Sequence, residues 1–438
     1  MNLDPSPSLD AGAAPRGASR TRFGAARRRR AVTNEARPRT IARSALWLVS
    51  SNVLYAGCQW ATIVVLAKLG TPVAIGHLGL ALAIATPVIL LSSLGLRAIQ
   101  ATDMTRRYPF AEYVLLRLIL NVVAAAGIAT AALLGMVEPA TVAILIPIGV
   151  AKIAEASSET CYGLAQRHER MRYVAISRAS RGALGLVALA TIVALGGTLA
   201  AGAWALAAAW SAFLVVVDLP TAGRLEPIVA RPRLGAVWQL ARESAPLGGV
   251  HGLFAAGQSL PRYLLGLSHG ATAVGYFTAL GAITPALAQL ASATGHAAAP
   301  RLGRAAVGDR RRYQRLVLQL VAAAGALGGA LVIGAVLAGD RFLALAYDTD
   351  YAAFRTTFVI IVAAASVAVV NEIFYFALVA SRRAPLQLAV ECVAIVVTAT
   401  GGLLLIPRLG VAGAALATAG GTVARATLAG TLVLRWAG

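Results

Sequence analysis

The chain has 438 residues, of which 58% are hydrophobic and 13% are charged, and its formal net charge is +21. Its mean hydropathy is +0.73. This composition excludes an ordinary soluble enzyme, because residues 45–434 are a nearly continuous series of long apolar stretches.

The first 43 residues differ in composition from the rest of the chain. They are rich in Pro, Ala, Ser, Gly and Arg and include four consecutive arginines at positions 27–30. Such a segment cannot bury a core, so we expect a disordered basic tail. The arginine run favours a topological anchor for the first span. Attraction to anionic membrane lipids is the alternative.

From residue 45 onward the sequence predicts twelve membrane-spanning helices. Each apolar run has the roughly 20 residues needed to cross a bilayer at 1.5 Å per residue. Helices are expected rather than barrel strands, because the runs are long and do not alternate with period two. The predicted spans are residues 45–67, 73–96, 113–136, 140–163, 178–198, 200–219, 244–267, 273–299, 316–338, 355–380, 386–406 and 411–434.

Clusters of arginine follow the even-numbered spans, whereas the other loops hold only Lys68, Arg341 and Arg408. Because basic residues mark the cytoplasmic side, both termini are expected to be cytoplasmic. This placement also accounts for the net charge, so nucleic acid is not an expected partner. The arginines that follow even-numbered spans are Arg97, Arg106, Arg107, Arg167, Arg170, Arg172, Arg178, Arg224, Arg231, Arg233, Arg242, Arg301, Arg304, Arg310, Arg311, Arg312, Arg315, Arg382 and Arg383.

An internal repeat relates the two halves of the chain. The segment Ala74–Leu78 (AIGHL) recurs as residues 273–277 (AVGYF), each at the start of an even span. The offset of 199 residues pairs Gln59 with Gln258. An even number of spans in each half keeps the repeats in the same orientation, around an axis along the membrane normal.

We therefore expect an all-α integral membrane protein with two pseudo-symmetric six-helix lobes. The N-lobe covers residues 44–219, a cytoplasmic linker covers 220–243, and the C-lobe covers 244–438. Apolar residues in the linker predict an interfacial helix. They are Leu234, Val237, Trp238 and Leu240.

With these features the sequence resembles the polysaccharide flippases, which translocate lipid-linked oligosaccharides for O-antigen and capsule. That family shares a superfamily with multidrug extruders and the lipid II flippase. The resemblance covers about residues 44–434, on the segments Gly76–Ala81 (GHLGLA) and Ser93–Arg97 (SLGLR) and on Asp103. It implies the bacterial inner membrane, alternating access and a polyprenyl-pyrophosphate-linked oligosaccharide. Glycan polymerases and glycosyltransferases are implied as partners, and no cofactor is expected.

Polar side chains inside spans are costly, so they are expected to face the bundle interior or a wet cavity. His251, Gln258 and Arg262 share a face of span 7, and Asn52 and Gln59 form the matching stripe on span 1. The resemblance implies that spans 1 and 7 face each other across the pseudo-axis, in which case both stripes line the lobe interface and can bind substrate. A guanidinium suits pyrophosphate. The alternatives are snorkelling for Arg262, interhelical hydrogen bonds for the amides and a structural role for His251.

Charged residues on span 4 form a second group. Lys152, Glu155 and Glu159 lie at i, i+3 and i+7. Mutual neutralisation is one interpretation, and a coupling site for a proton or Na⁺ is the other. Glu372 on span 10 is a further coupling candidate. Topological roles are expected for Arg117, Asp218 and Arg425, which lie nearer helix ends.

Motifs for catalysis are missing from the sequence. It contains no GxxxxGK[ST] phosphate loop, no GxSxG and no HExxH. The three cysteines, Cys58, Cys161 and Cys392, show no metal-ligand spacing. We therefore expect neither an enzyme nor a metal site. The alternative function is a cation-coupled exporter of small molecules on the same fold.

Overall fold

The computed structural model describes residues 38–435, except 104, 136, 229–231, 290–301, 303–309 and 381–383. The chain divides into two units, residues 1–46 and 47–438, and every contact discussed below lies within the second. In the described ranges all regular elements are helical, as the sequence predicts.

Helices overlap the predicted spans in both halves, and the seventh span and the start of the eighth belong to one element, α10 (Leu234–Gly281). Those before the linker are α2 (Pro38–Leu69), α3 (Pro72–Ser93), α4 (Leu96–Thr102), α5 (Phe110–Leu133), α6 (Pro139–Arg167), α7 (Met171–Ala194), α8 (Leu199–Phe213), the π-helical turn η1 (Leu214–Asp218) and α9 (Leu219–Gly223). Those after it are α10 (Leu234–Gly281), α12 (Arg310–Ala346), α13 (Thr349–Ala352), α14 (Arg355–Ala380), α15 (Ala384–Leu409) and α16 (Val411–Arg435).

Ten helical stretches of the described chain are long and apolar enough to cross a membrane. One of them, Leu234–Gln289, contains the predicted seventh span and the start of the eighth. The predicted twelfth span corresponds to α16, which is not one of these ten stretches. Gly270 interrupts its helix with φ 73° and ψ −176°, a conformation that essentially only glycine adopts. Residues 290–299 of the predicted eighth span lie outside the described residues.

Local sequence signals explain where several helices begin. Thr71 and Thr198 precede α3 and α8, and each side-chain oxygen accepts a hydrogen bond from a backbone N–H three residues later. Proline occupies the first position of α3 and of α6, where its missing N–H costs nothing. The turn expected between the fifth and sixth spans is present, with Gly196 at φ 83°.

The helix expected in the linker is present, and it continues directly into the seventh span as α10. Val237 and Leu240 are buried in an apolar cluster that includes Tyr108, whereas Leu234 and Trp238 are each 72% exposed. One face of this amphipathic segment therefore packs on the N-terminal helices, and the other face is exposed.

The loop after α4 is fixed by Asp103 and attached to α10. Burial alone would raise the pKa of Asp103, but hydrogen bonds from the backbone N–H groups of Arg107 and Tyr108 hold it below its usual value. The Arg107 side chain in turn makes an ion pair with Glu243 of α10 at 2.9 Å.

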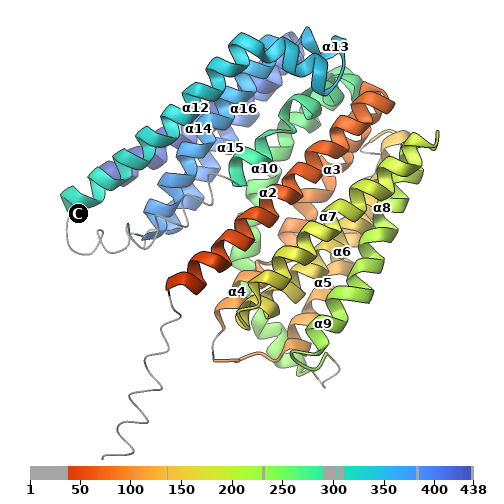
Figure 1. Cartoon of the computed structure of the whole chain (residues 1–438), viewed down its shortest axis with the longest axis vertical. Coiled ribbons are helices and arrows are strands. Elements are labelled where there is room, and N and C mark those ends of the chain that lie inside the picture. The colour runs from red at the N-terminus through yellow and green to blue at the C-terminus, as the bar shows by residue number, and fades with distance from the viewer. Residues whose placement is uncertain are drawn as a thin grey trace, which may run out of the picture. The chain divides into compact units, whose positions relative to one another are not determined.

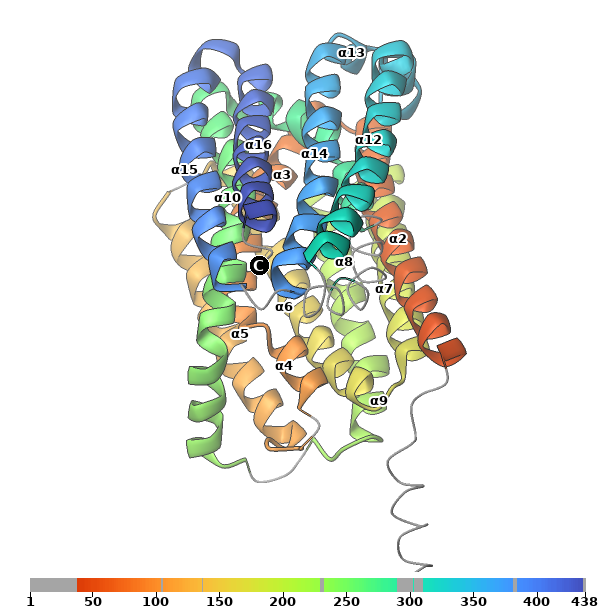
Figure 2. The same ribbon diagram turned by 90° about the vertical axis from the view of Figure 1, so that its left-hand side faces the viewer.

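The helix contacts fall into two groups. The N-terminal bundle comprises α3 to α9, in which α6 contacts α3, α5, α7 and α8. The C-terminal bundle comprises α10 to α16, in which α16 contacts α10, α14 and α15. Figure 1 shows the two groups on opposite sides of α2, and Figure 2 shows the pairs α12–α14 and α15–α16 side by side. The most extensive contact between them joins α3 to α10.

The repeated glycines lie where α3 and α10 approach most closely. A Cβ atom on Gly76 would lie 1.8 Å from the carbonyl oxygen of Ala271, and one on Gly275 would lie 1.8 Å from that of Pro72. Pro72 and Ala271 are separated by the same 199 residues as the two glycines. The same contact is thus made twice, as at a two-fold axis.

Aromatic and polar contacts join α2 to the C-terminal bundle near this crossing. Trp60 Nε1 donates to Tyr347 Oη at 3.1 Å, and Tyr347 Oη donates to the carbonyl oxygen of Ala279 at 2.7 Å. Lys68 Nζ donates to the carbonyl oxygen of Ala344 at 3.3 Å. These residues lie at the end of the bundles that the arginine pattern predicts to be extracytoplasmic.

Replacing Gly275 with Ala is expected to lower the free energy of unfolding by about 1–3 kcal/mol, because the added methyl group must displace α3 from α10. The matched control is Gly249→Ala, on the same helix with open space around its Cβ position. Denaturant unfolding of both variants in detergent gives the comparison. Equal stability of the two would show that the crossing accommodates a methyl group and would contradict the prediction.

Candidate functional site

The polar stripe of α2 is docked on the N-terminal bundle. Tyr55 Oη donates to Glu155 Oε1 at 2.5 Å, and Gln59 Nε2 donates to Tyr55 Oη at 3.2 Å. The Asn52 side-chain oxygen accepts from Arg178 at 2.9 Å. Asn52, Tyr55 and Gln59 share a face because they are spaced by three and four residues. Both amides therefore have protein partners within their own half of the chain.

Glu155 is the centre of this network. Its carboxylate lies 2.8 Å from Lys152 Nζ and 3.1 Å from an Arg181 nitrogen. The ion pair expected between Lys152 and Glu155 is therefore present. Glu159 pairs with Arg97 at 2.5 Å instead of with Lys152. Each carboxylate of the span 4 group is thus neutralised by a basic side chain of the same bundle.

Arg181 has no exposed surface and lies among three aromatic rings. Its guanidinium carbon is 5.3 Å from the centroid of Trp210, 5.6 Å from Tyr162 and 5.9 Å from Tyr55, distances at which cation–π attraction acts. The next turn of α7 has Gly185, where a Cβ would lie 2.2 Å from Trp210 Nε1. The glycine therefore makes room for the ring that covers Arg181.

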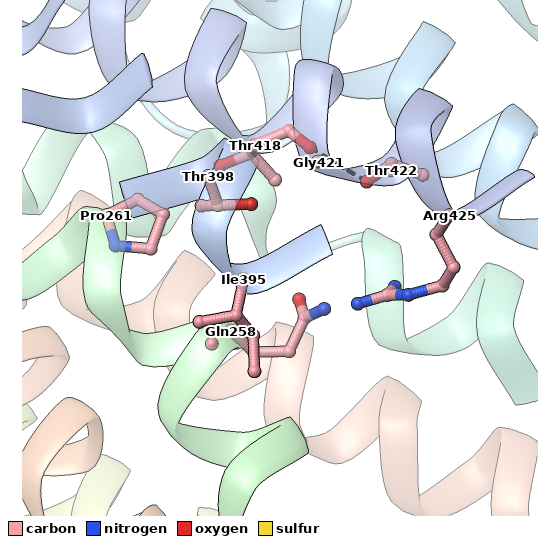
Figure 3. Close-up of a pocket in the computed structure, with 9 residues that line it drawn as sticks. Gln258, Pro261, Ile395, Thr398, Thr418, Gly421, Thr422 and Arg425 are labelled. Carbon is pink, nitrogen blue, oxygen red and sulfur yellow. Dashed lines mark hydrogen bonds between the residues drawn. The ribbon is translucent and has the colours of Figure 1, made fainter. Parts of the chain in front are cut away.

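A small pocket in the C-terminal bundle is shown in Figure 3, between α10, α15 and α16. The Gln258 amide and the Arg425 guanidinium point toward each other, with Thr398 and Thr418 on the opposite wall. Arg425 also pairs with Glu391 at 2.8 Å. The residues that line the pocket are Gly257, Gln258, Pro261, Ile395, Thr398, Thr418, Gly421, Thr422 and Arg425.

The remaining predicted residues of this half have different surroundings. Arg262 stacks 5.9 Å from the Phe277 centroid, and its buried Nε has no acceptor among the described residues. Glu372 is partly buried and lies within electrostatic reach of Arg425, and the described chain offers it no hydrogen bond or ion pair. His251 is partly buried beside Gly95 at the end of α3.

The structure thus gathers the predicted residues into two sets. Lys152, Glu155, Glu159, Asn52 and Gln59 belong to the network of the N-terminal bundle. A second set, Arg262, Gln258, His251 and Glu372, belongs to the C-terminal bundle. Among the described residues no hydrogen bond links one set to the other. Gly252 and Gly266 of α10 pack against α3 and Gly257 against α15, so the Gln258–Arg262 stripe lies between these two contact faces.

Three residues assigned to topology have internal partners instead. Arg425 makes the ion pair with Glu391. Arg117 is buried and donates to Thr160 and to the last carbonyls of α3. Asp218 is buried and accepts from the hydroxyls of Tyr173 and Ser177. These partners are expected on physical grounds, because a charge inside a spanning helix must be neutralised or hydrogen-bonded there.

Sequence reasoning also missed the partners of the predicted carboxylates. Arg181 is not among the predicted site residues, and Arg97 and Arg178 are predicted only as basic residues that follow even-numbered spans. The signal for Arg181 was its position inside an apolar span, three residues after Arg178, where both side chains face the same side of the helix.

Comparison with known proteins identifies the family. The model of a family described as polysaccharide biosynthesis protein matches residues 41–306, more than half of the chain. The chain belongs to this family. A curated relative, the capsular polysaccharide biosynthesis protein CapF of Staphylococcus aureus, is 29% identical over 142 residues, which are 32% of this chain and 35% of that protein. The chain therefore matches about a third of that relative's length.

Solved structures show the same fold. A multidrug resistance MATE family transporter of the MOP superfamily, in its inward-facing conformation, is similar with a TM-score of 0.70 at 16% identity, covering 90% of this chain and 97% of that one. The lipid II flippase MurJ, in an inward closed conformation, gives a TM-score of 0.70 at 8% identity, covering 89% and 86%. This member of the polysaccharide biosynthesis family is thus a multi-pass membrane protein with the same fold as these two solved structures.

Replacing Glu155 with Ala is expected to cost about 3–5 kcal/mol of stability, because it leaves Lys152 and Arg181 without their shared carboxylate in the bundle interior. Glu138→Ala is the control, since Glu138 is exposed and its side chain caps no N–H. Thermal unfolding in detergent measures both. A loss no larger than that of the control would mean that the network does not stabilise the bundle.

Proposed function

We propose that this protein translocates a polyprenyl-pyrophosphate-linked oligosaccharide across the bacterial inner membrane for surface polysaccharide synthesis. The observation that carries the proposal is the excess of basic side chains in the helical interior of a polysaccharide biosynthesis family member. In the N-terminal bundle Arg97, Lys152, Arg178 and Arg181 surround two carboxylates. Arg262 has no carboxylate within ion-pair distance in the described chain. Such an interior attracts an anionic headgroup.

The proposed architecture is twelve spans in two six-helix lobes, residues 44–219 and 244–438, with both termini cytoplasmic. Its support is the reciprocal contact of Gly76 and Gly275, which relates α3 and α10 as a two-fold axis would. One lobe would rock against the other around this crossing and expose a central cavity to each side in turn. The headgroup would cross in that cavity while the polyprenyl chain stays in lipid.

A cavity is needed because the headgroup is rich in hydroxyls and carries the pyrophosphate charge. Each polar group left without a hydrogen bond in hydrocarbon costs on the order of several kcal/mol. Paired hydrogen bonds from arginine to the pyrophosphate, and hydrogen bonds from amides to the sugar hydroxyls, can replace those that the headgroup makes to water. In this proposal Arg262 contacts the pyrophosphate, and Gln258, Gln59, Asn52 and His251 contact the rest of the headgroup. Their chemistry suits an anionic, hydroxylated ligand better than an apolar cation.

Coupling to an ion gradient is proposed to use Glu372. Glu155 and Glu159 already have basic partners, so neither needs an external cation. Glu372 has no such partner in the described chain and lies near the Glu391–Arg425 pair. A proton or Na⁺ on Glu372 would offset its charge and bias the lobe arrangement.

An imposed gradient of the coupling ion should accelerate translocation, and Glu372→Gln should remove that response.

The second candidate function is a cation-coupled exporter of small molecules. Glu372 favours it too, because a carboxylate without a basic partner suits a cationic substrate. Export of lipid-linked sugar would instead place the protein beside the glycan polymerase and glycosyltransferases of the same pathway. Sensitivity of depleted cells to cationic toxins, with normal surface glycan, would select the exporter.

Cells depleted of this protein and complemented with Arg262→Ala are expected to accumulate polyprenyl-linked oligosaccharide and lose surface glycan, because the pyrophosphate loses its guanidinium partner. Arg408→Ala, an exposed arginine at the end of α15, is the matched control and should restore both to normal. Lipid extraction with mass spectrometry quantifies the intermediate and supplies its mass. Normal glycan in the Arg262→Ala cells would remove Arg262 from the site, and normal glycan in depleted cells would refute the function.

A further inference from the structure

Arg178 lies in the second turn of α7 with its guanidinium held in one orientation. One terminal nitrogen donates to Asn52 Oδ1 at 2.9 Å, and the guanidinium carbon lies 5.0 Å from the Tyr55 ring centroid. Both partners come from the buried face of α2. An amide acceptor and a stacked ring orient a guanidinium without neutralising it.

The charge of Arg178 is not matched by a carboxylate of its own. In the described chain no carboxylate lies within ion-pair distance of it: Glu155 pairs with Lys152 and Arg181, and Glu159, although within electrostatic reach of Arg178, pairs with Arg97. The Arg178 Nε is buried and has no hydrogen-bond acceptor in that part of the chain. Nε and one terminal nitrogen form the edge with which arginine makes paired contacts to phosphate.

Arg117 shows what a structural arginine looks like in the same bundle. It is also buried, and no carboxylate of the described residues forms an ion pair with it. Its Nε donates to Thr160 Oγ1, and its terminal nitrogens donate to the carbonyl oxygens of Ser92 and Ser93 at the end of α3. A helix C-terminus carries partial negative charge, so this cation is accommodated by the fold. Arg178 has no such arrangement and retains its capacity to bind an anion.

Arg178 and Arg262 lie at different depths. Asn52, which orients Arg178, is 17 residues before the end of α2 at Leu69, or about 25 Å along the helix. Arg262 is eight residues before the break at Gly270, or about 12 Å. The reciprocal glycine contacts place these two helix ends at the same level. Arg178 therefore lies in the half predicted to be cytoplasmic, and Arg262 in the other half.

We propose that Arg178, oriented by Asn52 and Tyr55, is an anion-binding station that receives the phosphate or pyrophosphate group of the substrate before it reaches Arg262. This inference rests on the proposed function and adds an entry step to it. A headgroup entering from the cytoplasmic side first meets Arg178, whose guanidinium has no ion-paired carboxylate in the described chain. Rocking of the lobes then brings the headgroup to Arg262 on α10, which lies deeper in the membrane.

The test measures binding of inorganic pyrophosphate to the full-length protein in phosphatidylcholine nanodiscs by calorimetry. Arg178→Ala should weaken binding by about 10- to 100-fold, because a charged hydrogen-bond partner is removed. Arg178→Lys should weaken pyrophosphate binding less than Arg178→Ala does, because lysine keeps the positive charge but lacks the paired N–H donors of a guanidinium. Arg172→Ala, an exposed arginine on the first turn of the same helix, should bind as the unaltered protein does. Unaltered binding by Arg178→Ala would overturn the proposal.

Two further arms separate the remaining explanations. If Arg178→Ala does not fold, Arg178→Lys and Asn52→Ala carry the test, and wild-type affinity in both overturns the proposal. In phosphatidylglycerol nanodiscs, loss of the Arg178-dependent binding would assign the station to phospholipid headgroups and overturn the substrate role. Binding that depends on Arg178 in both membranes supports it. Depletion of the protein without build-up of the linked intermediate would refute the proposed function while leaving the anion station in place.

Discussion

The cost of an ionised side chain inside a membrane-spanning helix governs the interior of this protein. Such a group must find a counter-charge, a set of hydrogen bonds or a wet cavity. In the N-terminal bundle Glu155 and Glu159 find basic partners, and Arg117 finds helix-end carbonyls. Arg178 and Arg262 make no ion pair with a carboxylate in the described chain. The distribution of unmatched charge is therefore what points to an anionic ligand.

A second constraint is the close crossing of α3 and α10. Gly76 and Gly275 allow backbone contact between the helices, and the contact repeats itself with the offset of the internal repeat. A seam of small residues packs by van der Waals contact and can hold two bundles together without large interlocking side chains. Trp60 and Tyr347 reinforce one end of the assembly. This arrangement suits two rigid bodies that move about a shared line.

The sequence predicted the helices well and their neighbours poorly. An apolar run of fixed length predicts a spanning helix, so a helix overlaps each predicted span in the described residues, and ten stretches are long and apolar enough to cross a membrane. The linker helix was predicted from four apolar residues. Helical periodicity also placed Asn52 and Gln59 on one face. It does not say which helix that face meets, so the pairing of Glu159 with Arg97 and the aromatic enclosure of Arg181 could not be predicted. Those contacts depend on how α3, α6 and α7 pack.

The central claim is that the protein itself moves a lipid-linked sugar across the bilayer. The most direct measurement uses the purified protein in proteoliposomes that contain a fluorescent polyprenyl-pyrophosphate oligosaccharide. A membrane-impermeant quencher reports how much of the label lies in the outer leaflet over time. The account predicts that the protein makes the protected fraction accessible and that protein-free liposomes do not. Identical accessibility in both preparations would contradict it.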